Sequence, residues 1–127
     1  MVISELTYWM IIRGISCMQN KNNGIFFSLV EFASFCESGT NSGKAKSYAN
    51  AIQYLCDYLK IDITYLSAND IQLIKHEEYY ICSKNSESYN RFLKFLTSRG
   101  RSSYLKNGFV KAALPYFYQY CSLHNIL

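Results

Sequence analysis

The chain has 127 residues, of which 50% are hydrophobic and 17% are charged, and its formal net charge is +4. Disordered chains are poor in aromatic residues, so the 21 Phe, Tyr and Trp residues exclude intrinsic disorder and predict one folded domain. The longest apolar run, Tyr8 to Ile12, is far shorter than the ~20 residues that span a bilayer, so we expect a cytoplasmic protein.

The cysteine count supports the same expectation. An odd number leaves at least one thiol unpaired in any disulfide scheme, which favours a reducing compartment. Thiols on apolar helix faces behave as small hydrophobic groups with low reactivity. The five cysteines are Cys17, Cys36, Cys56, Cys82 and Cys121.

The first half of the chain reads as an appendage followed by two helices. Residues 1–23 form the predicted appendage, with a possible helix over 1–18, and residues 24–127 form the predicted domain. Apolar residues at helical spacing from Ile25 to Cys36 predict an amphipathic helix that ends near Gly39. Residues 44–60 have the most regular apolar stripe of the chain, which predicts a second helix.

Capping signals place the next two helices. Ser67 and Asp70 have the spacing of a capping box, so a helix is expected to start there. Another helix is predicted over residues 86–99, with Gly100 closing it in a left-handed conformation.

The final helical region is predicted over residues 104–123. Ser102 or Ser103 is expected to cap it, Gly108 interrupts the pattern, and Pro115 is expected to end or kink the helix at Leu114. No segment shows the sustained alternation of a strand. The sequence therefore predicts an all-α, single-domain bundle of five to six short helices.

Charge is unevenly distributed along the chain. Residues 47–83 hold five acids and two bases, whereas residues 88–127 hold six bases and no acid. Such a polarised surface attracts polyanions, although solvated helix faces give the same pattern. The turn from Arg99 to Ser103 adds two guanidinium groups, two hydroxyl groups and a helix start, which together predict a phosphate clamp.

Catalytic and metal-binding patterns are missing from the sequence. His76 and His124 are the only histidines, and no zinc-site spacing, phosphate-binding loop or nucleophile motif surrounds them. Glu77 and Glu78 are adjacent, so they point about 100° apart on a helix and are expected to be solvated. We expect no catalysis, no metal and no cofactor.

Aromatic residues offer an alternative function. Three roles are open to a group of aromatic residues: packing in the core, stacking on bases, or forming a surface on which a protein partner docks. The group comprises Tyr8, Trp9, Tyr116, Tyr118 and Tyr120. A protein-interaction or dimerisation module is therefore the alternative to nucleic-acid binding.

Three segments carry a resemblance to known families. They are GKAKSYANAIQYL at 43–55, YNRFLKFL at 89–96 and SSYLKNGFVKAALP at 102–115. Together they resemble the helical N-terminal module found ahead of the nuclease domain in some bacterial restriction enzymes. The layout is also similar to the SAM-like core-binding domain of tyrosine recombinases and phage integrases.

Either resemblance implies a non-catalytic module that binds double-stranded DNA in a restriction or recombination system, with a separate nuclease or recombinase domain as partner. The basic residues are expected to contact phosphates, and short polar residues beside them are expected to assist. The expected DNA contacts are Lys44, Lys46, Ser47, Asn50, Arg91, Lys94, Arg99, Arg101, Ser102, Ser103, Lys106, Asn107 and Lys111.

Overall fold

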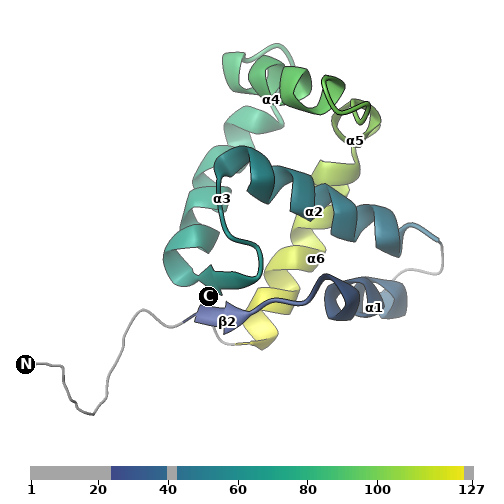
Figure 1. The fold of residues 1–127 in the computed structure, drawn as a ribbon, viewed down its shortest axis with the longest axis vertical. Helices are drawn as coiled ribbons and strands as arrows, with labels where there is room; N and C mark the ends of the chain where they lie inside the picture. Colours follow the sequence, from purple (N-terminus) through teal and green to yellow (C-terminus); the bar gives the residue numbers. More distant parts are fainter. Residues whose placement is uncertain (1–23, 40–42, 125–127) are drawn as a thin grey trace, which may run out of the picture.

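The computed structural model describes residues 24–39 and 43–124, which form a small helical bundle (Figure 1). The predicted appendage, with Tyr8, Trp9 and Cys17, lies outside the described residues. The elements in chain order are β2 (Gly24–Phe26), α1 (Leu29–Gly39), α2 (Ala45–Leu59), β3 (Tyr65–Ser67), α3 (Ala68–Ile81), α4 (Glu87–Thr97), α5 (Ser103–Lys106) and α6 (Phe109–Leu123). The all-α prediction is confirmed, with six helices in the described part of the chain.

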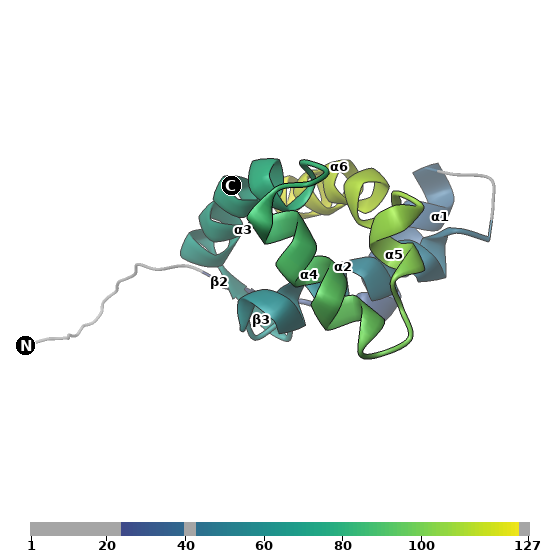
Figure 2. The same cartoon turned by 90° about the horizontal axis from the view of Figure 1, so that it is seen from above.

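Helices α2 and α6 cross at the centre of the bundle, and α1 packs against both (Figure 1). Helix α3 lies along the other side, while α4 and α5 sit together at one end (Figures 1 and 2). The apolar stripe predicted over 44–60 is the buried face of α2, which includes Ile52, Leu55 and Cys56. The regular spacing of these residues explains why this helix was the easiest to predict.

A short sheet replaces the predicted first turn of α1. Residues Gly24–Phe26 pair antiparallel with Tyr65–Ser67, so that Ile25 lies opposite Leu66. The helix starts only at Leu29, because the Ser28 hydroxyl accepts a hydrogen bond from the Glu31 N–H at 3.2 Å. The assignment of Ile25 to a helix face was therefore wrong.

The capping predictions have mixed outcomes. The capping box at the start of α3 is confirmed, since Ser67 and Asp70 exchange hydrogen bonds of 3.0 and 3.2 Å. Gly100 has the left-handed conformation expected of it, with φ of 69°. Ser102 takes the predicted N-cap position of α5, which begins at Ser103, but its side chain makes no capping hydrogen bond.

Pro115 does not end the last helix. The break falls at Gly108, with φ of 78°, and α6 then continues past Pro115 to Leu123. A proline inside a helix costs about 3 kcal/mol, whereas each large apolar side chain buried beyond it contributes about 1.5–3 kcal/mol. Phe117 and Tyr120 are both buried in the core, which offsets the cost.

The core is rich in aromatic rings and thiols. The rings of Phe27 and Phe32 each contact the rings of Phe117 and Tyr120 edge to face, in the C-terminal half of α6. The described cysteines are free thiols, and burial raises the pKa of all four, with Cys36 at about 11 and Cys56 and Cys121 at about 12. Among the described helices, none is long and apolar enough to cross a membrane.

Candidate nucleic-acid interface

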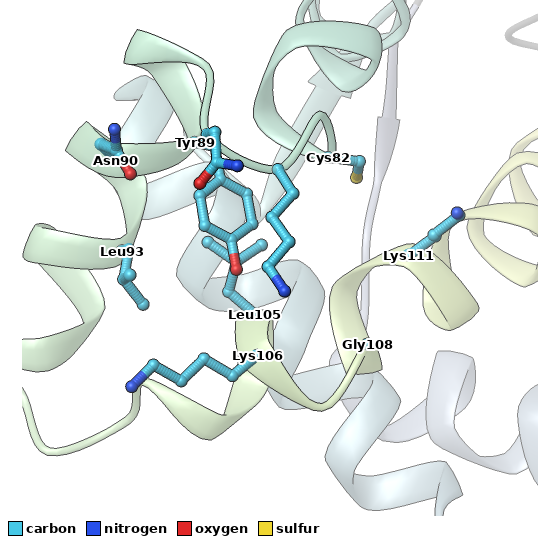
Figure 3. Close-up of a pocket in the computed structure, with 10 residues that line it drawn as sticks. Cys82, Tyr89, Asn90, Leu93, Leu105, Lys106, Gly108 and Lys111 are labelled. Carbon is cyan, nitrogen blue, oxygen red and sulfur yellow. The ribbon is translucent and has the colours of Figure 1, made fainter.

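A pocket of about 520 Å³ opens where α4, α5 and the start of α6 meet the turn that follows α3 (Figure 3). Three lysines line it, and its lining includes no carboxylate. Figure 3 shows Lys106 below the Tyr89 ring and Lys111 farther to one side, beyond Cys82. The lining residues are Cys82, Lys84, Asn85, Tyr89, Asn90, Leu93, Leu105, Lys106, Gly108 and Lys111.

Two backbone features build the walls of this pocket. Asn85 has φ of 73°, which turns the chain sharply between α3 and α4. Ser86 then fixes the start of α4, since its hydroxyl donates to the Tyr80 carbonyl at 2.6 Å and accepts from the Tyr89 N–H at 2.9 Å. Gly108 makes the second sharp turn, between α5 and α6. These turns bring Tyr89 close to the lysines.

The charge of Lys111 acts on the Cys82 thiol, which also lines the pocket. Burial raises the pKa of the Cys82 thiol, Glu78 raises it further, and the positive charge of Lys111 opposes both effects. No ion pair within the described residues neutralises Lys84, Lys106 or Lys111. The pocket therefore presents uncompensated positive charge.

Arg91, by contrast, is already compensated. Its guanidinium lies 2.8 Å from the Glu87 carboxylate, one helical turn earlier on α4. A hydrogen bond with the Tyr58 hydroxyl and the charge of Glu87 raise the pKa of Arg91. The charge count that began at residue 88 missed Glu87, so Arg91 contributes less to the basic surface than its sequence context indicated.

The predicted phosphate clamp is tied into the fold. Arg99 lies over the Phe95 ring, 3.7 Å from its centroid, and donates to the Phe95 carbonyl at 3.1 Å. Arg101 donates from Nε to the Tyr54 hydroxyl at 3.0 Å, which links the α4–α5 turn to α2. Both side chains remain exposed. Their remaining N–H groups are still available to an anion, because each guanidinium carries five.

The predicted contacts on α2 lie at a second hollow, separate from the lysine pocket. Lys46 and Asn50 line a groove between α1 and α2, together with Glu37. Asn50 also donates to the Tyr104 hydroxyl of α5 at 3.4 Å. Helix α5 thus contacts α2 through Tyr104, while its Leu105 lines the lysine pocket.

The other predicted contacts differ in exposure. Lys44, Lys94, Ser103 and Asn107 are exposed, whereas Ser47 and Ser102 are half-buried. Because α5 is only four residues long, its start offers less to a phosphate than the sequence indicated.

Sequence reasoning missed the pocket residues that precede or flank the basic helices. Lys84 and Asn85 lie in the turn before α4. Tyr89 and Asn90 lie in the first half of α4, so they are far from Lys106 in the sequence. One signal was present: the Ser-Lys-Asn-Ser run at 83–86 is typical of a turn that precedes a capped helix.

The tyrosines proposed as a partner surface are mostly engaged inside the protein. Tyr120 is buried, Tyr116 donates to the Gly39 carbonyl at 3.4 Å, and Tyr118 donates to Glu78 at 2.6 Å. Glu78 is half-buried and accepts this hydrogen bond from Tyr118. The prediction that Glu78 is a solvated surface residue was therefore wrong. The exposed tyrosines lie instead on α3, where Tyr79 is 74% exposed.

No group of three or more potential metal ligands occurs among residues 24–39 and 43–124. The chain matches no protein-family model, no curated protein and no solved structure. The resemblance to restriction-enzyme and recombinase modules therefore stays a prediction based on the three sequence segments.

Proposed function

We propose that this chain is a non-catalytic module that binds double-stranded DNA through the surface formed by α4, α5 and the first turn of α6. The observation that carries the proposal is that Lys84, Lys106 and Lys111 all line one pocket, whose lining includes no carboxylate. A hollow of this charge favours a phosphate-bearing ligand.

The wider surface supports the same ligand. Residues 82–111 hold seven bases and one acid, and that acid, Glu87, is paired with Arg91. Lys94, Arg99 and Arg101 extend the charge along α4 and its exit turn, beyond the pocket itself. Charge spread over several elements suits a polyanion that contacts many cations at once better than it suits a small anion.

The biological setting follows from the resemblance. In a restriction or recombination system this module recognises or clamps DNA in the cytoplasm, and a separate nuclease or recombinase domain supplies the chemistry. This part of the proposal rests on the three sequence segments quoted above.

Fluorescence anisotropy with a labelled 20-base-pair duplex of arbitrary sequence tests DNA binding. We expect the double variant Lys106→Gln with Lys111→Gln to bind the duplex at least tenfold more weakly than the unmodified protein at low salt. The matched control, Lys60→Gln with Lys75→Gln, removes the same charge outside the pocket and should lose much less affinity. Equal losses in the two double variants would show that only net charge matters and would refute the proposed surface.

A protein-interaction module remains the second candidate, because α3 exposes Tyr79, Tyr80 and Leu73. Tyr79 and Tyr80 contact each other edge to face, with ring centroids 5.3 Å apart, and His76 contacts Tyr80. Sedimentation of the Tyr79→Ser variant tests self-association. A dimer that dissociates in this variant while DNA affinity is absent would favour the second candidate.

A further inference from the structure

We propose that the lysine pocket receives a single unpaired DNA nucleotide, whose base stacks on the Tyr89 ring and whose flanking phosphates lie against Lys106 and Lys111. This inference rests on the proposed DNA binding and assigns a ligand to the pocket within that surface.

Tyr89 is the first reason. Every other Phe and Tyr ring in the described part of the chain contacts another aromatic ring, whereas Tyr89 contacts none. The Tyr89 hydroxyl makes no hydrogen bond to any residue in the described part of the chain either. Tyr89 is half-buried and packs in part against the core, and the part of its ring that lines the pocket offers a stacking surface that the face of any nucleobase can use.

The other walls suit the remaining parts of a nucleotide. Leu93 and Leu105 provide apolar surface beside the ring. Asn85 and Asn90 carry amide groups that can pair with the polar edge of a base. The volume of about 520 Å³ lies within the range of roughly 300–1,000 Å³ found for sites that hold small ligands.

The lysine positions match a nucleotide within a strand better than a free anion. Lys106 belongs to α5 and Lys111 to α6, and Figure 3 shows them in different directions from the Tyr89 ring, so a base stacked on this ring can have a cation toward each neighbouring phosphate. A free phosphate ion would gain little from cations that are set apart.

The nucleotide must be unpaired because of where Tyr89 lies. In a duplex both faces of a base are covered by its neighbours, and a base has to leave the stack before a side chain in a pocket can contact its face. Two sources supply such a nucleotide: the end of a strand that overhangs a duplex, and a base extruded from within the duplex. Both share the chemistry of an exposed base between phosphates.

Binding to a matched set of DNA hairpins tests the inference. The set comprises a blunt hairpin, the same hairpin with one overhanging thymidine at the 3′ or the 5′ end, one with a single-thymidine bulge, and one with an overhanging abasic nucleotide. We expect an overhang or a bulge to bind at least fivefold more tightly than the blunt hairpin, as base stacking on an aromatic residue provides. The abasic overhang should bind like the blunt hairpin, since it adds phosphate without a base.

Two substitutions separate stacking from packing. Tyr89→Phe keeps the ring and should preserve the preference for the unpaired base, whereas Tyr89→Leu keeps apolar packing and should abolish it. For each variant the preference is the ratio of its affinity for the overhang or bulge to its own affinity for the blunt hairpin, so a general change in duplex binding cancels. Tighter binding to the overhang than to the blunt hairpin, without tighter binding to the bulge, identifies strand ends as the source of the nucleotide. Tighter binding to the bulge alone identifies extruded bases as the source.

The outcomes distinguish this inference from the proposed function. Tight binding to every hairpin with no preference for the unpaired base would overturn the inference and leave duplex binding intact. An equal gain with the abasic overhang, or an unchanged preference in Tyr89→Leu, would also overturn it. Failure to bind any of the DNAs at low salt would overturn both proposals.

Discussion

Arg101 has two roles: it makes a hydrogen bond within the fold, and it is a proposed phosphate contact. Two substitutions separate these roles. Arg101→Ala removes the cation and the 3.0 Å hydrogen bond to the Tyr54 hydroxyl, whereas Tyr54→Phe removes only the hydrogen bond. Because Arg101 is exposed, we expect each variant to lower the free energy of unfolding by about 0.5–1.5 kcal/mol, which is the usual net value of one hydrogen bond. Urea unfolding measures this change.

The DNA affinities of the same variants should differ. A hydrogen bond to a charged group is worth about 1.5–3 kcal/mol, so Arg101→Ala should weaken duplex binding by roughly ten- to 150-fold and do so for all sequences. Tyr54→Phe leaves the guanidinium charged and frees its Nε–H group, so it should leave affinity unchanged. Equal losses of affinity in both variants would mean that Arg101 only positions the α4–α5 turn.

Three further predictions concern the fold and the pocket. Leu55 is 1% exposed on α2, so Leu55→Ala should lower the free energy of unfolding by about 2–5 kcal/mol in a thermal melt, whereas exposed Lys46→Ala on the same helix should change it by less than about 0.5 kcal/mol. Two hydrogen bonds from Thr64 lower the pKa of Asp62 below its ordinary value of 3.8, so the carboxylate stabilises the fold above that pH. In urea unfolding, Asp62→Asn should therefore lower the free energy of unfolding at neutral pH, and the difference from the unmodified protein should shrink as the pH falls below 3.8. Cys82 is only partly buried and lines the lysine pocket, so mass spectrometry should find it alkylated before the three buried thiols, and duplex DNA should slow that reaction; equal rates with and without DNA would place the DNA elsewhere.

Elements with long, regular patterns could be predicted from the sequence. Helix α2 repeats its apolar residues over four turns, and the capping box of α3 lies within four consecutive residues. Both signals are local, so no tertiary information is needed to interpret them.

The errors arose where distant segments decide the structure. The three-residue strand at Gly24–Phe26 is too short to show alternation, and its partner Tyr65–Ser67 is about 40 residues away. The capping spacing of Ser28 and Glu31 marked the true start of α1 but was overlooked. Pro115 was expected to end or kink the helix at Leu114, and it does not end the helix because the residues after it are buried in the core.

The candidate site shows the same division. Lys106 and Lys111 could be identified from the basic C-terminal third, since their charge is a property of the sequence alone. Tyr89 could not, because its lack of a ring partner depends on where every other aromatic residue packs. The pairing of Arg91 with Glu87 is a local i,i+4 contact, and a charge count that began one residue earlier would have included it.

The salt dependence of duplex binding tests the central claim most directly. If four to six of the basic residues contact phosphates, the logarithm of the affinity should fall against the logarithm of the salt concentration with a slope of about −3.6 to −5.4, at roughly −0.9 per phosphate. Removal of Lys106 and Lys111 together should make the slope shallower by up to about 2. A slope near zero, or no binding at low salt, would contradict DNA binding by this surface.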